Sequence, residues 1–297
     1  MRLEVDDVLA GSRLDRFLVA RVPHMSRAKA KRFVVEGWVR VNGRHPKKGQ
    51  SLALGDIVHL ERLPDPPDFR AIPEDAPLEV LHEDESCVVV NKAPGIPTHP
   101  LRADELGTLA NRLVHRYPEM AEVGYRRREP GVLHRLDTGT SGVLIAARTT
   151  EAFEVLRELL RGEQITKRYA ALCDGLVHAP QRIDFPIAQR DARSMRVCRD
   201  VAEEERLGGQ RAVTEILKAE PLGSCSLITA QADSARRHQL RVHLAAIGHP
   251  LLGDELYGGP PGLSRHALHA SRLRVEAPWG TIDISAPLPS DMQALLR

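Results

Sequence analysis

The stretch His134-Arg135-Leu136-Asp137-Thr138-Gly139-Thr140-Ser141-Gly142 places a polar turn directly in front of an apolar run, Val143 to Ala147. Five apolar residues bounded by turn-forming residues predict a short buried strand. An Asp followed by Thr-Gly readily closes a tight turn through its own side chain. Asp137 is therefore expected at the mouth of a buried strand, either as a turn former or as a reactive carboxylate.

The short Asp-Thr-Gly-Thr sequence also occurs in aspartic proteases, which need two carboxylates that share a proton. The chain has no second Asp-Thr-Gly or Asp-Ser-Gly, so only a homodimer could complete such a pair. The cation of Arg135 would also be an unusual neighbour for two carboxylates that share a proton. A protease is therefore disfavoured.

Strand and helix patterns are intermixed on both sides of this turn. The predicted strands are Cys87 to Val90, Val143 to Ala147, Tyr169 to Leu172, Ala212 to Leu217, Ser226 to Ala230 and Thr281 to Ser285, and the predicted helices are Thr150 to Arg161 and His238 to Ile247. The order lacks the strict alternation of strand and helix that builds parallel sheets. We therefore predict an α+β fold with a mixed, largely antiparallel sheet flanked by helices and loops.

The window His-Arg-Leu-Asp-x-x-Thr-Ser-Gly resembles the catalytic motif of the RluA class of pseudouridine synthases. Further segments match this family in the same order along the chain. They are Asn91-Lys92-Ala93-Pro94-Gly95, Thr98-His99-Pro100, Lys167-Arg168-Tyr169, Arg236 to His243, Gly248-His249-Pro250, Gly253-Asp254 with Tyr257-Gly258, and Leu268-His269-Ala270. The resemblance implies a pseudouridine synthase fold from about residue 80 to the end of the chain.

The same resemblance assigns roles to individual residues. Asp137 corresponds to the catalytic carboxylate, Tyr169 to the ring that lies against the base, and Arg241 to the partner of the carboxylate. Arg135, together with His134 of the same motif, is the candidate for base flipping. The reaction rearranges a glycosidic bond without net oxidation, so a carboxylate suffices and no cofactor is expected.

The chemistry explains why an arginine belongs beside the acid. In a pocket that excludes water, the charged form of a carboxyl group is disfavoured. A guanidinium at salt-bridge distance stabilises this charged form again. Two departures from the family pattern lie near these residues: Ser234-Ala235 replaces the usual Thr-Gly, and the proline of Lys92-Ala93-Pro94-Gly95 is displaced by one position. We still expect activity, because neither change touches the residues assigned to chemistry.

The positive charge is concentrated at the start of the chain. Residues 1 to 64 carry 13 Lys+Arg and 7 Asp+Glu, although the whole chain has 42 against 40 and a net charge of only +2. A basic segment of this kind either binds a polyanion or forms a solvated surface.

The arrangement of the basic residues favours a polyanion. Helices are predicted at residues 13 to 22 and 27 to 36, with Ser26 as the N-cap of the second, followed by a strand and an Asn42-Gly43 turn. The segment from residue 11 to 62 resembles the S-four (alpha-L) RNA-binding module. The resemblance implies RNA contacts from Ser26, Arg27, Lys29, Lys31, Arg32 and, more weakly, Lys47 and Lys48.

Five prolines and four acidic residues punctuate residues 64 to 77, which indicates an extended linker. The predicted organisation is an RNA-binding domain at residues 1–63, a linker at residues 64–77 and a pseudouridine synthase catalytic domain at residues 78–297. Structured RNA is the expected partner, and large-subunit ribosomal RNA is the first choice of substrate. Transfer RNA, or a non-catalytic role in ribosome assembly, remains the alternative.

Composition narrows the cellular setting. The 297 residues contain no apolar run near the roughly 20 residues of a membrane span, and the first residues do not resemble a signal peptide. We expect a cytoplasmic monomer with no membrane contact. The four cysteines are widely separated and are expected to be reduced and mostly buried. His238 and His243 are five residues apart, so their rings do not share a helix face, and no metal is expected.

Overall fold

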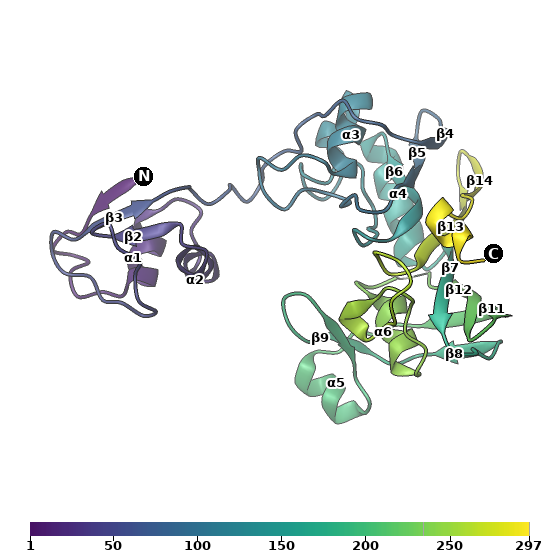
Figure 1. The fold of residues 1–297 in the computed structure, drawn as a ribbon. Coiled ribbons are helices and arrows are strands. Elements are labelled where there is room, and N and C mark those ends of the chain that lie inside the picture. Colours follow the sequence, from purple (N-terminus) through teal and green to yellow (C-terminus); the bar gives the residue numbers. More distant parts are fainter. Residues whose placement is uncertain (234, 297) are drawn as a thin grey trace. The chain divides into compact units, whose positions relative to one another are not determined.

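The computed structural model describes every residue except 234 and 297, and it divides into two compact units, Met1–Phe69 and Arg70–Arg297 (Figure 1). The division falls inside the proline-rich stretch. No helix in the described part of the chain has the length and apolar character needed to cross a membrane.

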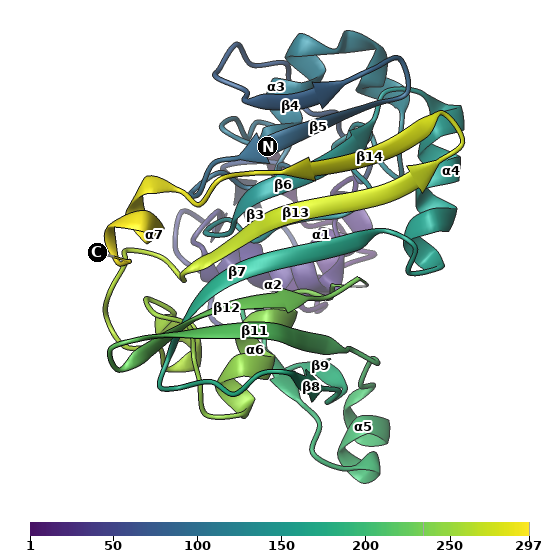
Figure 2. The ribbon, with the colours of Figure 1, turned by 90° about the vertical axis from the view of Figure 1, so that its right-hand side faces the viewer.

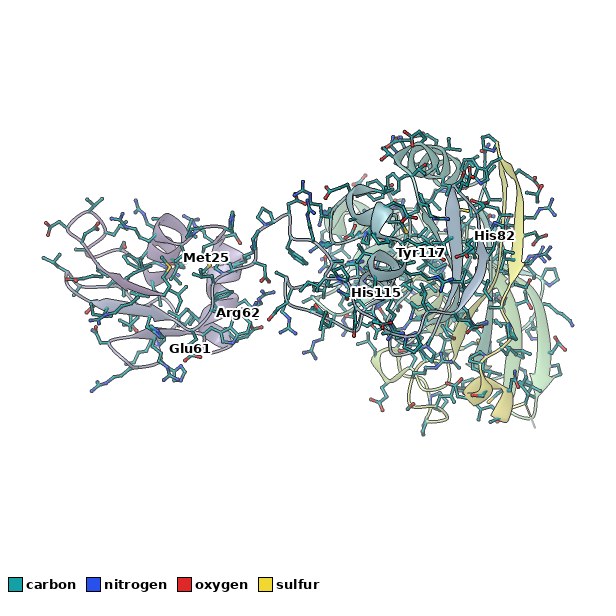
Figure 3. The ribbon with its side chains drawn as sticks, turned by 90° about the horizontal axis from the view of Figure 1, so that it is seen from above. Met25, Glu61, Arg62, His82, His115 and Tyr117 are labelled. Carbon is teal, nitrogen blue, oxygen red and sulfur yellow. The ribbon has the colours of Figure 1, made fainter. Side chains whose placement is uncertain are left out.

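The first unit packs two helices against a small antiparallel sheet. Its elements are β1 (Arg2–Glu4), α1 (Leu14–Arg21), α2 (Arg27–Val35), β2 (Val39–Val41) and β3 (Ile57–Leu60), with the strand order β1-β3-β2. The predicted apolar faces of both helices are confirmed, because Phe17, Leu18 and Phe33 are fully buried. Arg62, which is labelled in Figure 3, follows β3. Its guanidinium lies 4.7 Å from the ring centre of Trp38.

Local chemistry sets the ends of α2 and β2. The Ser26 hydroxyl accepts the Lys29 amide N–H, which is the predicted N-cap. Asn42 and Gly43 both have positive φ, which a tight two-residue turn after a strand requires.

The second half of the proline-rich stretch is attached to the second unit. It has no helix or strand, yet the Asn111 amide donates to the Ile72 carbonyl at 2.7 Å and Glu74 accepts the Gly107 N–H. The Arg112 guanidinium donates to the Pro77 carbonyl. Residues 70–77 therefore line α3 and are not a free linker.

The second unit is built around one large sheet. Its strands are β4 (Val80–Glu83), β5 (Cys87–Lys92), β6 (Ser141–Ala147), β7 (Thr166–Asp174), β8 (Gln181–Ile183), β9 (Ile187–Gln189), β10 (Met195–Val197), β11 (Thr214–Leu222), β12 (Cys225–Gln231), β13 (Leu268–Ala277) and β14 (Gly280–Ser285). Its helices are α3 (Leu109–Arg116), α4 (Thr150–Arg161), α5 (Val201–Leu207), α6 (Gln239–Ala246) and α7 (Ser290–Ala294), with short 3₁₀ turns at Pro118–Glu122 and Glu255–Tyr257.

Nine strands lie side by side in the order β4-β5-β6-β13-β7-β12-β11-β8, with β14 paired to β13 (Figure 2). All pairs are antiparallel except β6 with β13. The predicted α+β class with a largely antiparallel sheet is confirmed. Because β6 and β13 run in the same direction, the polar turn before β6 lies beside the start of β13.

Both faces of the central strands are buried. On one face, Val88, Val90 and Leu144 pack in an apolar cluster that includes Leu240 of α6. On the other face, the alternate residues Val89 and Ile145 belong to a second cluster that includes residues of α4. A strand that is covered on both sides needs a continuous apolar run, and β5 and β6 show one. Three of the four cysteines are buried and all four are free, as expected.

Candidate active site

The turn that carries Asp137 is fastened on one side by the segment after β5. The buried Thr98 hydroxyl donates to the Leu136 carbonyl at 2.8 Å and accepts the Leu136 amide at 3.2 Å. The ammonium of Lys92 donates to the Thr138 carbonyl at 3.3 Å. The residues directly before and after Asp137 are therefore held by two side chains from the Asn-Lys and Thr-His-Pro segments.

The other side of the turn is fastened by the segment before β13. Arg265 donates to the Gly139 carbonyl at 2.8 Å, and the Thr140 hydroxyl lies 2.8 Å from His266 Nε2. Burial lowers the pKa of His266 to about 4, so its ring is neutral at pH 7. The Asp137 turn thus has polar partners on both flanks.

Gly142 permits the close approach of β6 and β13. It has φ +115°, and a Cβ there would lie 2.1 Å from the Ala270 carbonyl oxygen. Lys92, Gly142, Ala270 and Tyr169 oppose one another across β5, β6, β13 and β7. This row brings the Asn-Lys and Lys-x-Tyr segments, which are far apart in sequence, to the same part of the sheet.

Arg241 links Asp137 to a second acid. Its Nη1 donates to Asp137 Oδ2 at 3.1 Å, while Nε and Nη2 donate to the two oxygens of Asp254 at 2.7 and 2.8 Å. Burial by itself would lower the pKa of Arg241, but the bonds to Asp254 and the charges of both acids raise it. Asp254 is 2% exposed, so this two-pronged pair fixes the plane of the guanidinium.

A buried polar network positions α6, the helix that carries Arg241. The Gln239 amide donates to the Thr214 hydroxyl at 3.1 Å, and His243 Nδ1 lies 3.0 Å from the same oxygen. Because a carbonyl can only accept, Nε2–H of His243 donates to the Phe185 carbonyl at 2.9 Å. In the neutral ring Nδ1 is then an acceptor, and the Thr214 hydroxyl donates to it. Gln239 and His243 thus attach α6 to β11 and to the Phe185 loop.

His238 stands at the start of α6 in the left-handed conformation, with φ +55°. Tyr257 Oη accepts the Met195 amide at 2.9 Å and lies 2.8 Å from His238 Nδ1. Nε2 of His238 lies 3.8 Å from Asp137 Oδ2. Burial lowers the pKa of His238, although the Asp137 charge opposes the shift.

One small cavity joins the three residues assigned to chemistry. Asp137, Tyr169, Arg241 and the exposed Arg135 line it, with α6 and Leu268 completing the wall. Its volume is about 30 Å³, roughly enough for one or two water molecules. Tyr169 is 4% exposed, and burial raises the pKa of its hydroxyl, which stays protonated at neutral pH.

The structure places His134 differently from Arg135. His134 Nε2 accepts the Ile145 amide of β6 at 3.4 Å, and burial lowers the pKa of the ring to about 3. The neutral ring of His134 therefore packs against the sheet and supports β6 through this hydrogen bond. Ser234 lies outside the described residues, and Ala235 beside it lines the cavity.

Several side chains at this site were not singled out from the sequence. Asp254, Tyr257, His238 and Lys92 all lie within the matched segments, so the signal was present in the motifs. Burial lowers the pKa of Lys92 to about 7, and the Asp137 charge acts against this shift. Their roles depend on contacts that only the folded chain provides.

The residues predicted to bind RNA lie on α2 and the following hairpin of the first unit. Ser26, Arg27, Lys31, Arg32, Lys47 and Lys48 are exposed. Lys29 is half-buried, and its ammonium donates to the His24 and Asp65 carbonyls, both at 3.1 Å. Lys29 therefore braces this unit, whereas Arg27 and Lys31 present their charges to solvent. Arg32 is also exposed and lies 3.9 Å from a Glu36 carboxylate oxygen.

One group of potential metal ligands occurs among the described residues, at His82, Asp84 and Cys87 (His82 is labelled in Figure 3). Their ligand atoms lie within 4.8 Å of one another. One oxygen of Asp84 accepts the Ser86 and Cys87 amides, and Arg148 donates to the Asp84 carbonyl. A tight turn closed by Asp84 accounts for this cluster.

Comparison with known proteins places the site in context. Residues 86–246 match the family model described as RNA pseudouridylate synthase. Ribosomal large subunit pseudouridine synthase D of Yersinia pestis is 33% identical over 97% of this chain and 90% of its own length. An uncharacterized RNA pseudouridine synthase of Chloroflexus aurantiacus is 37% identical over 96% and 89%. Among solved structures, human RNA pseudouridylate synthase domain containing 4 superposes with a TM-score of 0.57 at 26% identity, covering 73% of this chain and 91% of its own.

Proposed function

Since the chain belongs to the RNA pseudouridylate synthase family, whose members are isomerases, we propose that it converts specific uridines of large-subunit ribosomal RNA into pseudouridine. Relatives named ribosomal large subunit pseudouridine synthase D align with it along nearly the whole of both chains. Their names support ribosomal RNA over transfer RNA as the substrate.

The observation that carries the proposal is the carboxylate of Asp137 paired with Arg241 in a cavity that Tyr169 also lines. A protein that bound RNA without reacting would have no need to bury a guanidinium between two acids beside a tyrosine. Burying charges is costly unless they are paired, so such clusters are typical of reactive sites.

Asp137 is the reacting group in this proposal. The reaction breaks the bond between N1 of uracil and C1′ of ribose, turns the base and joins C1′ to C5, while a proton leaves C5 and N1 gains one. Asp137 either attacks C1′ or removes a proton from the sugar, and the Arg241 guanidinium orients the carboxylate in both cases. Arg241 Nη1 engages Oδ2, which leaves Oδ1 for the sugar.

The uridine must leave its stack before it can react, at a cost of a few kcal/mol. Tyr169 offers a ring against which the uracil stacks, worth about 1–3 kcal/mol. Arg135, exposed at the rim of the cavity, fills the space that the base leaves in the RNA. The cavity must widen to admit the base, because its 30 Å³ is smaller than a uracil ring.

In this proposal the first unit binds RNA without selecting a sequence. The exposed cations of α2 contact phosphates, which provides affinity without selecting a sequence. A monomer in the cytoplasm, where ribosomal RNA is found, completes the proposed setting.

Mapping pseudouridine in a strain that lacks the protein tests the proposal. We expect defined sites in large-subunit ribosomal RNA to lose the modification and to regain it on complementation. Loss confined to transfer RNA would replace the proposed substrate. An unchanged map together with defective ribosome assembly would favour a non-catalytic assembly factor.

A further inference from the structure

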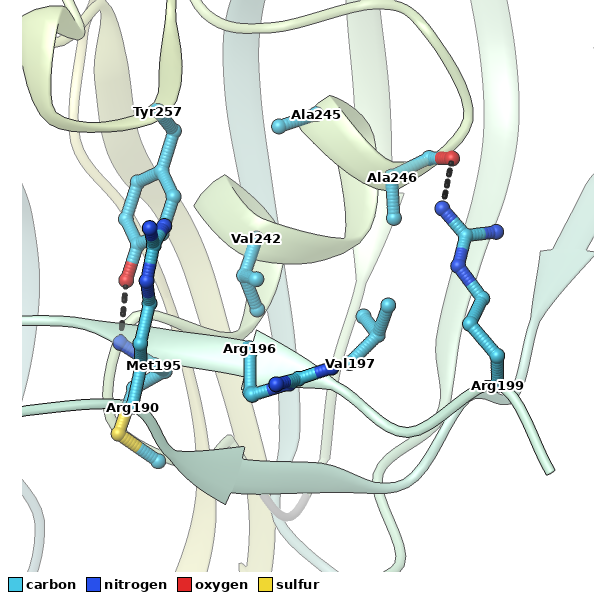
Figure 4. A pocket seen from close by; sticks show the side chains of 9 residues that line it. All are labelled: Arg190, Met195, Arg196, Val197, Arg199, Val242, Ala245, Ala246 and Tyr257. Atoms are coloured by element: carbon cyan, nitrogen blue, oxygen red, sulfur yellow. Dashed lines mark hydrogen bonds between the residues drawn. The ribbon is translucent and has the colours of Figure 1, made fainter. Parts of the chain in front are cut away.

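A second, larger cavity lies between the β9–β10 hairpin and α6 (Figure 4). Its volume is about 460 Å³, within the usual range of pockets for small ligands. Val197 of β10 faces Val242 and Ala246 of α6 across it, and Tyr257 closes one end (Figure 4). The floor is apolar, whereas the walls carry arginines.

The hairpin that forms one wall is firmly built. Asp191 accepts the Arg193 and Ser194 amides and the Ser194 hydroxyl, and these bonds lower its pKa to about 2. The Arg237 guanidinium donates to the carbonyls of Ala192 and Arg193 at 3.1 and 2.9 Å. The loop is therefore held in one shape next to α6.

Three arginines border the apolar floor: Arg190, Arg196 and Arg199 (Figure 4). Arg196 is paired with Glu203 at 2.6 Å, so its charge is locally neutralised. Arg199 uses one nitrogen on the Ala246 carbonyl and lies 5.1 Å from the Phe185 ring centre, which leaves its other donors available. Arg190 is exposed, and the acid next to it, Asp191, is engaged by the loop. Arg190 and Arg199 thus offer positive charge to a ligand.

The cavity shares a wall with the Asp137 site. Tyr257 bonds to His238 and to the Met195 amide, and the guanidinium of Arg241 lies 5.1 Å from its ring centre. Val242 and Ala246, which line the floor, follow Arg241 on the same helix. A ligand seated here would therefore be next to the reacting uridine.

From this arrangement we infer that the cavity between β9–β10 and α6 binds one unpaired RNA nucleotide near the target uridine, an inference that rests on the proposed function. The base lies on the apolar floor between Val197 and Ala246, and its phosphate contacts Arg190 and Arg199. An apolar slot flanked by arginines matches a base with its phosphate, and unstacked bases are what RNA-modifying proteins recognise. The cavity thereby helps select which uridine reacts.

Equilibrium binding of a large-subunit ribosomal RNA transcript tests this subsite. Every variant is made in an Asp137→Asn background, so that turnover does not alter the probe. Ala246→Trp fills the cavity without changing charge, and Arg190→Ala removes one cation without filling it. Arg161→Ala, an exposed arginine of α4, is the matched control.

Each variant has a distinct expected result. Arg190→Ala should raise Kd about fivefold and reduce the slope of log Kd against log salt by about one. Ala246→Trp should raise Kd about tenfold with the slope unchanged, because it occupies the space of the base and leaves the phosphate contacts in place. In the double variant the losses should not add, because both changes act on the same nucleotide.

The inference is overturned if Arg190→Ala and Ala246→Trp, both folded by circular dichroism, bind the transcript as the Arg161→Ala control does. If Ala246→Trp does not fold, Arg190→Glu takes its place, with a larger expected loss than Arg190→Ala. A wild-type protein that forms no pseudouridine in this RNA would instead contradict the proposed function. The two failures are therefore distinguishable.

Discussion

Asp254 holds the guanidinium of Arg241 through two hydrogen bonds of 2.7 and 2.8 Å and so aims its remaining nitrogen, Nη1, at Asp137. Asp254 is almost completely buried and does not line the cavity, whereas Asp137 does. One arginine thus contacts two acids, and in the proposed function Asp254 positions it while Asp137 reacts.

Replacing Asp254 by Asn tests this positioning role. The variant keeps the shape of the side chain but loses its charge, so Arg241 is less well oriented. We expect kcat to fall about 10- to 100-fold with little change in KM, as for loss of transition-state stabilisation. Steady-state kinetics on the RNA transcript measures this, and Asp283→Asn, which removes an exposed acid paired with Arg272, should leave kcat unchanged. Equal kcat in both variants would contradict the role.

Tyr169 is predicted to act through its ring. Tyr169→Phe keeps the ring and should retain kcat/KM within about tenfold, while Tyr169→Ala should lose roughly 5- to 150-fold, the equivalent of about 1–3 kcal/mol of stacking. Tyr125→Ala, at an exposed tyrosine, controls for loss of an aromatic residue. If Phe were as damaging as Ala, the hydroxyl and not the ring would carry the role.

Charge reversal on α2 tests whether the first unit binds RNA. Changing Arg27, Lys31 and Arg32 to Glu should weaken RNA binding at low salt and flatten its salt dependence, because each lost phosphate contact removes roughly 0.7 to 0.9 from the slope. Reversing three exposed cations of the second unit, Arg161, Lys218 and Arg274, gives a protein of the same net charge for comparison. Unchanged affinity in the α2 variant at low salt would remove this role.

Acid should destabilise the second unit through its buried neutral histidines, of which His134 and His266 are examples. Burial lowers the pKa of His134 to about 3 and of His266 to about 4, below the ordinary 6.5 of the unfolded chain. Below pH 6.5 the unfolded chain binds more protons than the native one, so the free energy of unfolding is highest above pH 6.5 and falls toward pH 4.

Urea unfolding at several pH values measures this loss. Between about pH 6.5 and about pH 4, the free energy of unfolding should fall less steeply for the His266→Gln variant than for the wild type. The two slopes against pH should differ by the equivalent of up to one bound proton. The exposed His178 provides the control, since His178→Gln should follow the wild-type curve. Parallel curves for wild type and His266→Gln would contradict this account.

The fold class could be predicted because β5, β6 and α4 have strong apolar patterns of the right length. The strands β9 and β10 could not, because three residues each are too short to show a period. β13 was not predicted either, although from Arg272 to Ala277 its charged and apolar residues alternate in the pattern of a half-buried strand.

The candidate site divides in the same way. Asp137, Tyr169, Arg241 and Arg135 could be identified from motifs, and the fold brings them to one cavity. The bonds of Asp254 to Arg241 and of Tyr257 to His238 join segments whose contact depends on how α6 packs on the sheet. These residues lie within the matched segments, but their contacts with one another emerged only from the structure.

The rate of pseudouridine formation by Asp137→Asn tests the central claim most directly. Asn matches the carboxylate in shape, so RNA binding should be retained while the reacting charge is lost. On a large-subunit ribosomal RNA transcript under single-turnover conditions, we expect the wild type to form pseudouridine and the variant to be slower by at least about 10³-fold, with similar Kd. A variant that reacts within about tenfold of the wild-type rate would contradict the assignment of Asp137 as the reacting carboxylate.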